Sequence, residues 1–104
     1  MKNIKIIEVP SEIGAGTRGA SLGIEAIKIA ALDFMSNFFV HFPSEKIEVE
    51  NQILFEPIQS PYAKRMQGVL TMYERVSKAV CDSIKGHCFP VVISGDHSNA
   101  GGTI

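Results

Sequence analysis

Short apolar runs alternate with helical patterns along this chain of 104 residues. Residues 4–9 and 89–93 are nearly continuous apolar runs rich in β-branched side chains, which is typical of strands covered on both faces. Residues 46–50 alternate charged and apolar side chains, so we predict a second strand there, nearer the edge of the sheet. These three segments are the expected strands of the fold.

The predicted helices lie between these strands. Apolar residues recur every three or four positions from 22 to about 38 and again from 62 to 85. We expect Ser21 to cap the first helix and Gly86 to end the second. Residues 51–61 have no clear period and are expected to be a connector. The alternation of strand and helix predicts a parallel sheet with right-handed crossovers in a single small domain.

Charge and composition exclude several classes of protein. Ten basic and eleven acidic side chains leave the chain nearly neutral, which argues against nucleic acid or an anionic membrane as a partner. No apolar stretch approaches the roughly 20 residues that cross a bilayer. The first residues lead directly into a strand-like pattern and not into a signal-peptide core, so we expect a cytoplasmic protein. Cys81 and Cys88 have no zinc or disulfide spacing and are expected to be plain thiols.

A glycine-rich loop, residues 11–21, follows the first strand at the edge where parallel sheets bind ligands. Residues 14–19 match the G-x-G-x-x-G pattern of dinucleotide sites, but the glycines fall in the middle of the loop. No carboxylate follows about 20 residues later, near Phe39, so a nucleotide-binding module is the weakest interpretation. Arg18 is expected either to orient a carboxylate-bearing substrate or to hold the loop through hydrogen bonds to its carbonyls.

The loop after the third strand contains Asp96, His97 and Ser98 and has two interpretations. In one, Asp96 or Ser98 caps a helix that begins within residues 99–104, and His97 is a buried, hydrogen-bonded histidine. In the other, His97 binds a metal ion and Asp96 ligates it or orients the imidazole. A metal site needs further ligands, and the other two histidines are poorly placed: His41 follows the first helix and His87 lies at the opposite edge.

Two segments resemble a known family, the ureohydrolases, which include arginase, agmatinase and formiminoglutamase. The segment Ser94-Gly95-Asp96-His97-Ser98 resembles their Gly-Gly-Asp-His-Ser sequence. The segment Gly16-Thr17-Arg18-Gly19, with Gly23, resembles the opening loop of arginase, where Arg-Gly precedes Gly-Pro and a helix. The resemblance covers the whole chain and corresponds to about the first third of a full enzyme. Ser94 replaces the usual first glycine, although Gly95 is retained, and Ile24 stands where proline is typical.

This resemblance implies a three-layer α-β-α fold, of which residues 1–104 supply the first three strands and their helices. It implies a binuclear manganese site in which His97 is a ligand and Asp96 and Ser98 support it. Arg18 and Gly19 would position the first loop. The family's other ligands come from Asp-x-His-x-Asp and Asp-x-Asp segments, and this sequence contains neither.

The implied reaction is the hydrolysis of a guanidino substrate, L-arginine to L-ornithine and urea, through a metal-bridging hydroxide. No catalytic residue is assigned within this sequence, and these residues alone are expected to be inactive. The alternative from another functional class is a non-catalytic binding or assembly module. Because three strands with an uncovered side leave an apolar face, we expect self-association, as a homo-oligomer, under either interpretation.

Overall fold

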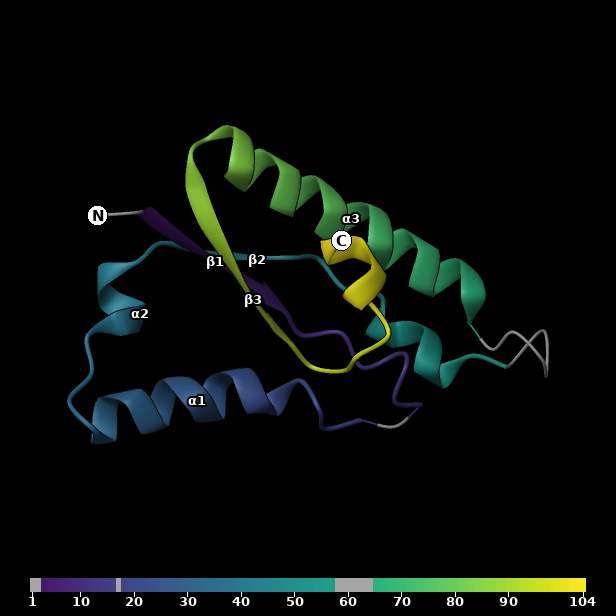
Figure 1. Ribbon diagram of the computed structural model, residues 1–104. Coiled ribbons are helices and arrows are strands. Elements are labelled where there is room, and N and C mark those ends of the chain that lie inside the picture. The colour runs from purple at the N-terminus through teal and green to yellow at the C-terminus, as the bar shows by residue number, and fades with distance from the viewer. Residues whose placement is uncertain (1–2, 17, 58–64) are drawn as a thin grey trace.

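The computed structural model describes residues 3–16, 18–57 and 65–104. Three parallel strands form one sheet in the order β2-β1-β3 (Figure 1). They are β1 (Asn3–Val9), β2 (Ser44–Lys46) and β3 (Cys88–Ser94). The central strand is β1, in which Ile6 pairs with Ser44 on one side and with Val91 on the other. The predicted parallel sheet, with the charged second strand at its edge, is confirmed.

The bounds predicted for the second strand are wrong. Pairing with β1 covers Ser44–Lys46, so the strand starts two residues earlier than predicted and does not extend over residues 47–50. One further hydrogen bond, from the Ile47 N–H to the Glu8 carbonyl at 2.9 Å, follows the strand. Ile47 and Val49 then contribute to the hydrophobic core. The alternation of charged and apolar residues therefore reflects a segment that no longer pairs with β1 but still directs Ile47 and Val49 into the core.

The first predicted helix is divided into α1 (Leu22–Asp33) and α2 (Phe38–His41). Met35 has a left-handed backbone with a φ of 57°, and the Ser36 N–H donates to the Ala31 carbonyl at 2.8 Å. A left-handed residue with such a hydrogen bond is a common helix ending. Apolar spacing continues across this break, so periodicity alone predicted one helix over residues 22–38.

The second long helix, α3 (Met66–Lys85), begins later than predicted. Residues 62–64 of the predicted segment lie outside the described part of the chain, and Arg65 has a left-handed φ of 55° directly before the helix. Gly86 is the C-terminal cap, as predicted, but the left-handed residue that follows is His87, with a φ of 59°.

Two short 3₁₀ helices complete the described elements. One, η1 (Asn51–Phe55), lies in the segment predicted as a connector, of which residues 58–61 are outside the described part. The other, η2 (Ala100–Thr103), takes the place of the helix expected within residues 99–104. It packs on α3 so closely that a Cβ atom on Gly102 would lie 2.8 Å from the Tyr73 carbonyl oxygen.

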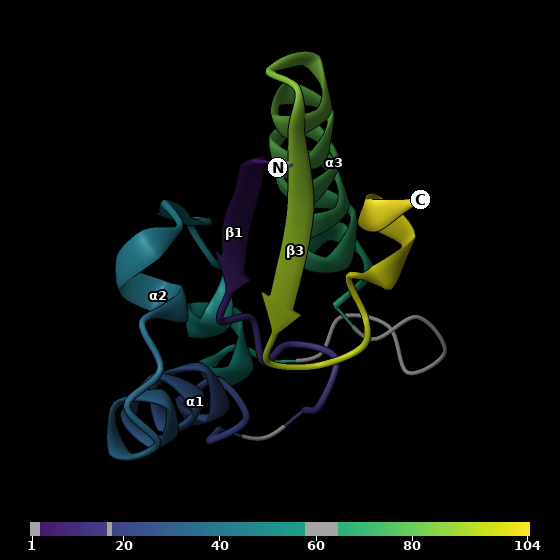
Figure 2. The same cartoon turned by 60° about the vertical axis from the view of Figure 1, so that its left-hand side comes forward.

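The main core lies between the sheet and α3, and α1 lies on the opposite side of the sheet (Figures 1 and 2). Successive β1 side chains point to opposite faces, so Ile7 and Val9 face α3 while Glu8 faces α1. There, Lys28 Nζ of α1 lies 2.9 Å from both carboxylate oxygens of Glu8. Among the described residues, no helix has the length and apolar character to span a bilayer.

Candidate functional site

The loops that follow β1 and β3 meet at the carboxyl edge of the sheet. The Gly95 N–H donates to the Val9 carbonyl at 2.9 Å, and the Gly14 N–H donates to Asp96 Oδ2 at 3.0 Å. A Cβ atom on Gly95 would lie 2.5 Å from the Ser11 carbonyl oxygen, and one on Gly14 would collide with the Ser98 side chain. Both glycines are therefore needed for the two loops to approach this closely.

Asp96 is held by hydrogen bonds on both carboxylate oxygens. Its Oδ1 accepts from the Ser98 N–H at 2.8 Å and from Ser98 Oγ at 2.5 Å, while Oδ2 accepts from Gly14. Neither Asp96 nor Ser98 caps the helix that follows, because the N-cap residue of η2 is Asn99. The capping prediction is thus wrong, and the carboxylate instead ties the third-strand loop to itself and to the first loop.

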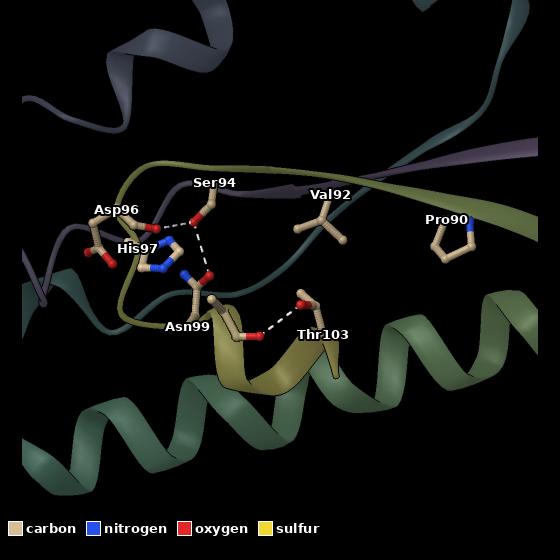
Figure 3. Close-up of a pocket in the computed structure, with 8 residues that line it drawn as sticks. Pro90, Val92, Ser94, Asp96, His97, Asn99 and Thr103 are labelled. Atoms are coloured by element: carbon tan, nitrogen blue, oxygen red, sulfur yellow. Dashed lines mark hydrogen bonds between the residues drawn. The ribbon is translucent and has the colours of Figure 1, made fainter.

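His97 is solvent-exposed, which rules out the buried histidine of the first interpretation. Its imidazole lies beside an open pocket of about 360 Å³ between β3 and η2 (Figure 3). Within residues 3–16, 18–57 and 65–104, no three His, Cys, Asp or Glu side chains gather as a metal site would require. His41 in α2 and His87 before β3 are not brought to His97. The described residues therefore do not give His97 the two further ligand side chains that a three-ligand site needs.

Asn99 lines the same pocket and was not predicted as a site residue. It is 1% exposed, and its Oδ1 lies 3.0 Å from Ser94 Oγ, whose single hydroxyl hydrogen is directed to the nearer Asp96 carbonyl at 2.6 Å (Figure 3). Its Nδ2 is buried without a hydrogen-bond partner. An asparagine after a loop is usually a turn residue, so no feature of the sequence predicted this buried amide.

Glu12 organises the first loop and was also missed. Its side chain is 1% exposed, and Oε2 accepts from the Ser21 N–H at 2.9 Å, from Ser21 Oγ at 2.8 Å and from the Gly19 N–H at 2.6 Å. The hydrogen bond from the Ser21 backbone, with those from its hydroxyl and from Gly19 and the charge of Arg18, lowers the pKa of Glu12 to about 2, although burial opposes the shift. Ser21 is the N-cap residue of α1, as predicted, but its hydroxyl makes no capping hydrogen bond because it donates to Glu12.

Arg18 has a partner that differs from both predicted ones. Its Nε lies 2.5 Å from Glu12 Oε1, and its guanidinium carbon lies 5.6 Å from the centre of the Phe55 ring. Gly19 follows with a φ of 125°, a conformation that glycine adopts without strain. Arg18 thus contacts a carboxylate of its own loop. The one feature of the sequence that indicates the pair of Glu12 and Arg18 is that Glu12 is the single acidic residue in the loop of residues 11–21.

The same contacts weaken the nucleotide interpretation. A dinucleotide site leaves backbone N–H groups before a helix free to bind a pyrophosphate. Here the N–H groups of Gly19 and Ser21, directly before α1, already donate to Glu12. Thr17, within the same glycine pattern, lies outside the described residues. An internal carboxylate therefore occupies the place that an external anion would take.

Comparison with known proteins identifies the family to which the chain is similar. The model of the arginase family matches residues 2–104. The chain belongs to this family. An arginase from Brevibacillus brevis is 32% identical over 114 residues, which cover 99% of this chain and 35% of the relative. An arginase from Staphylococcus aureus (strain MRSA252) is 30% identical over 106 residues, with 99% and 35% covered.

Solved structures show the same fold. A crystal structure of arginase from Bacillus subtilis has a TM-score of 0.65 and 28% identity, over 98% of this chain and 32% of that one. A second arginase structure, from Bacillus subtilis subsp. subtilis str. 168, has a TM-score of 0.69 and 27% identity, over 99% of this chain and 33% of that one. These matches confirm the family resemblance and the α/β fold class. The chain spans about a third of the length of the curated relatives it matches.

Proposed function

We propose that this arginase-family chain supplies one ligand, His97, to the binuclear manganese site of an amidinohydrolase. The observation that carries the proposal is the exposed imidazole in the Gly95-Asp96-His97-Ser98 segment at the carboxyl edge of the sheet. This edge is where open α/β sheets bind their ligands. In this proposal, residues 1–104 are the N-terminal part of a single α/β domain, and the other ligands come from residues outside them.

The described residues fit part of such a site and not the whole of it. Imidazole and carboxylate are suitable ligands for manganese. His97 offers an imidazole, but both carboxylate oxygens of Asp96 are already engaged by Ser98 and Gly14. Asp96 and Ser98 therefore hold the backbone on either side of His97. Arg18 and Gly19 hold the neighbouring loop through Glu12.

The chemistry of the proposed reaction follows from the metal pair. A manganese pair held partly by His97 would supply the Lewis acidity that makes hydroxide available at neutral pH for the hydrolysis of a guanidinium group. The substrate would be a guanidino compound, L-arginine in the first instance, which gives L-ornithine and urea. Because the described residues gather no complete metal site, we propose that these 104 residues alone are inactive. A cytoplasmic location belongs to the same proposal.

A second candidate function is an assembly module that acts without catalysis. The observation that favours it is a set of large apolar side chains, each more than two-thirds exposed, that belong to α1, to the turn after it, to α2 and to η1: Leu22, Leu32, Phe34, Met35, Val40 and Phe55. Where such side chains form a contiguous patch on a soluble protein, a partner usually covers them. Homo-oligomer formation is compatible with either function.

A chimera tests the role of His97. The matching N-terminal third of the Bacillus subtilis arginase is replaced by this chain, and urea release from arginine is measured with manganese present. The unmodified chimera should release urea, and His97→Ala should reduce the rate by at least a factor of about 100, because loss of a ligand costs more than the roughly 10–100-fold lost when a residue that only orients a ligand is removed. An active His97→Ala chimera would remove His97 from the site.

The matched control in the chimera is His87→Asn. His87 has a left-handed φ of 59°, a conformation that asparagine tolerates well, so the change removes an imidazole with little backbone cost. Urea release should remain close to that of the unmodified chimera. A loss equal to that of His97→Ala would show that the assay reports general damage, and the assignment of His97 would then fail.

A further inference from the structure

We propose that Glu12 is a positioning residue for His97. In this inference, the buried carboxylate of Glu12 fixes the loop of residues 11–21, and that loop in turn fixes the turn that carries the imidazole. The consequence for catalysis rests on the metal role proposed for His97. The mechanical coupling between Glu12 and His97 does not, and it can be measured without metal or substrate.

Donors from its own loop surround the Glu12 carboxylate and form a cradle. Three hydrogen bonds, from the Gly19 N–H, the Ser21 N–H and the Ser21 hydroxyl, reach Oε2 at 2.6 to 2.9 Å. Oε1 lies in ion-pair contact with Arg18 Nε at 2.5 Å, and the side chain is only 1% exposed. Buried carboxylates keep their charge only when they are paired in this way. Residues 18–21 are thus held to the start of the loop through one side chain.

The main chain of Glu12 is also held by hydrogen bonds. Its N–H donates to Asn51 Oδ1 at 2.7 Å, and Asn51 Nδ2 donates to the Pro10 carbonyl at 2.9 Å. The Glu12 carbonyl accepts from the Ala15 N–H at 3.1 Å. Asn51 is buried and belongs to η1, a segment 39 residues along the chain. Glu12 is therefore fixed at its amide, its carbonyl and its carboxylate.

Hydrogen bonds through Gly14 and Asp96 connect this loop to the turn that carries His97. Gly14 lies inside the turn that Glu12 and Ala15 close, and its N–H donates to Asp96 Oδ2 at 3.0 Å. The other oxygen of Asp96 accepts from the Ser98 N–H at 2.8 Å. Asp96 and Ser98 flank His97 in the chain, so its backbone lies between two residues fixed by this network. Release of Glu12 is expected to loosen the turn that presents the imidazole.

A second buried acid, Glu8, provides a matched comparison. It is 2% exposed, precedes the same loop in β1, and is paired with Lys28 at 2.9 Å. Its partner belongs to α1, on the face of the sheet away from α3, and neither residue bonds to the loops around His97. Loss of the Glu8 charge therefore disturbs a buried carboxylate of similar kind without touching the proposed coupling.

The experiment uses the 104-residue chain, with nuclear magnetic resonance signals of the His97 ring and hydrogen exchange of the Gly14 amide as readouts. Glu12→Ala should shift the His97 signals and speed Gly14 exchange about tenfold, the factor expected when a charge-assisted network around one amide is lost. Formate added at high concentration should return both readouts toward those of the unmodified chain, because the variant leaves the three hydrogen-bond donors and Arg18 without their carboxylate. Glu8→Gln should leave both unchanged.

Two results would overturn the inference. One is a folded Glu12→Ala chain with His97 signals and Gly14 exchange like those of the unmodified chain. The other is an equal shift in Glu8→Gln, which would show a general loss of stability. If Glu12→Ala does not fold, Ser21→Ala, which removes one donor from the cradle, is judged by the same two readouts. The proposed metal role of His97 can fail in the chimera while this coupling stands, so the two outcomes remain distinct.

Discussion

At the scale of single residues, the charge of Glu12 makes stability depend on pH. The pKa of this carboxyl is about 2, against an ordinary value of 4.5, because of the hydrogen bonds from Ser21 and Gly19 and the charge of Arg18. A lowered pKa in the folded state contributes stability that is complete above the unfolded value and is lost as the pH falls toward the folded one. We therefore expect the free energy of unfolding to decrease between pH 4.5 and pH 2.

Urea unfolding at a series of pH values checks this prediction. Glu8 contributes in the same direction, because the hydrogen bond and charge of Lys28 lower its pKa even though burial raises it. Glu12→Gln should flatten the pH dependence and leave the smaller part that belongs to Glu8. An equally steep dependence in Glu12→Gln would show that the Glu12 carboxylate is not held as described.

The residues of the candidate site were predictable to different degrees. The loop with Asp96, His97 and Ser98 carries a specific motif, so the sequence was enough to select it and to place it after a strand. Glu12 carries no motif, and its importance comes from donors seven and nine residues away that meet only after the loop folds. Periodicity and motif spacing contain no information about such a contact. The loop therefore had to be seen before its organising residue could be named.

At the scale of elements, an ion pair attaches α1 to the sheet. Ile24 is the one buried residue of α1, and Lys28 pairs with Glu8 of β1, with side chains 28% and 3% exposed. Lys28→Ala should lower the free energy of unfolding by about 2 kcal/mol, because it leaves the Glu8 charge buried without its partner. Chemical denaturation of the purified variant measures this loss.

The double variant Glu8→Leu with Lys28→Leu is the control for this pair. Two apolar side chains leave no charge uncompensated, so the double variant should be less destabilised than the sum of the two single Leu variants. Additive losses would mean that the two side chains do not interact across the helix and the sheet.

The elements themselves were predicted where the pattern reflects burial on a fixed face. The strand β1 and the stripe of α3 face the core, while β3 packs on it only through the partly buried Val92. The apolar residues still mark all three elements with bounds correct to a few residues. The break after α1 depends on the left-handed backbone of Met35. Methionine has no preference for this conformation, so the sequence could not predict the break. The β2 register depends on where the chain leaves β1, which the alternation of charge did not reveal.

At the scale of the whole molecule, the exposed apolar side chains predict self-association. Phe34 and Met35, at the end of α1, are 86% and 92% exposed. Sedimentation should show a mean mass that increases with protein concentration, and Phe34→Ser with Met35→Ser should weaken the increase, because apolar area is removed from the contact. A monomer at every concentration up to about 1 mM, a weak-binding limit, would contradict this expectation.

The central claim is that this chain supplies one ligand to a metal site. Calorimetric titration of Mn²⁺ into the 104-residue chain tests it most directly, because it measures how many ions bind and how tightly. Among the described residues, His97 stands without two further ligand side chains, so at most one weak binding event is expected, and His97→Ala should abolish it. Tight binding of two ions, or urea release from arginine by the same sample, would contradict the claim that this chain supplies a single ligand to a site completed by other residues.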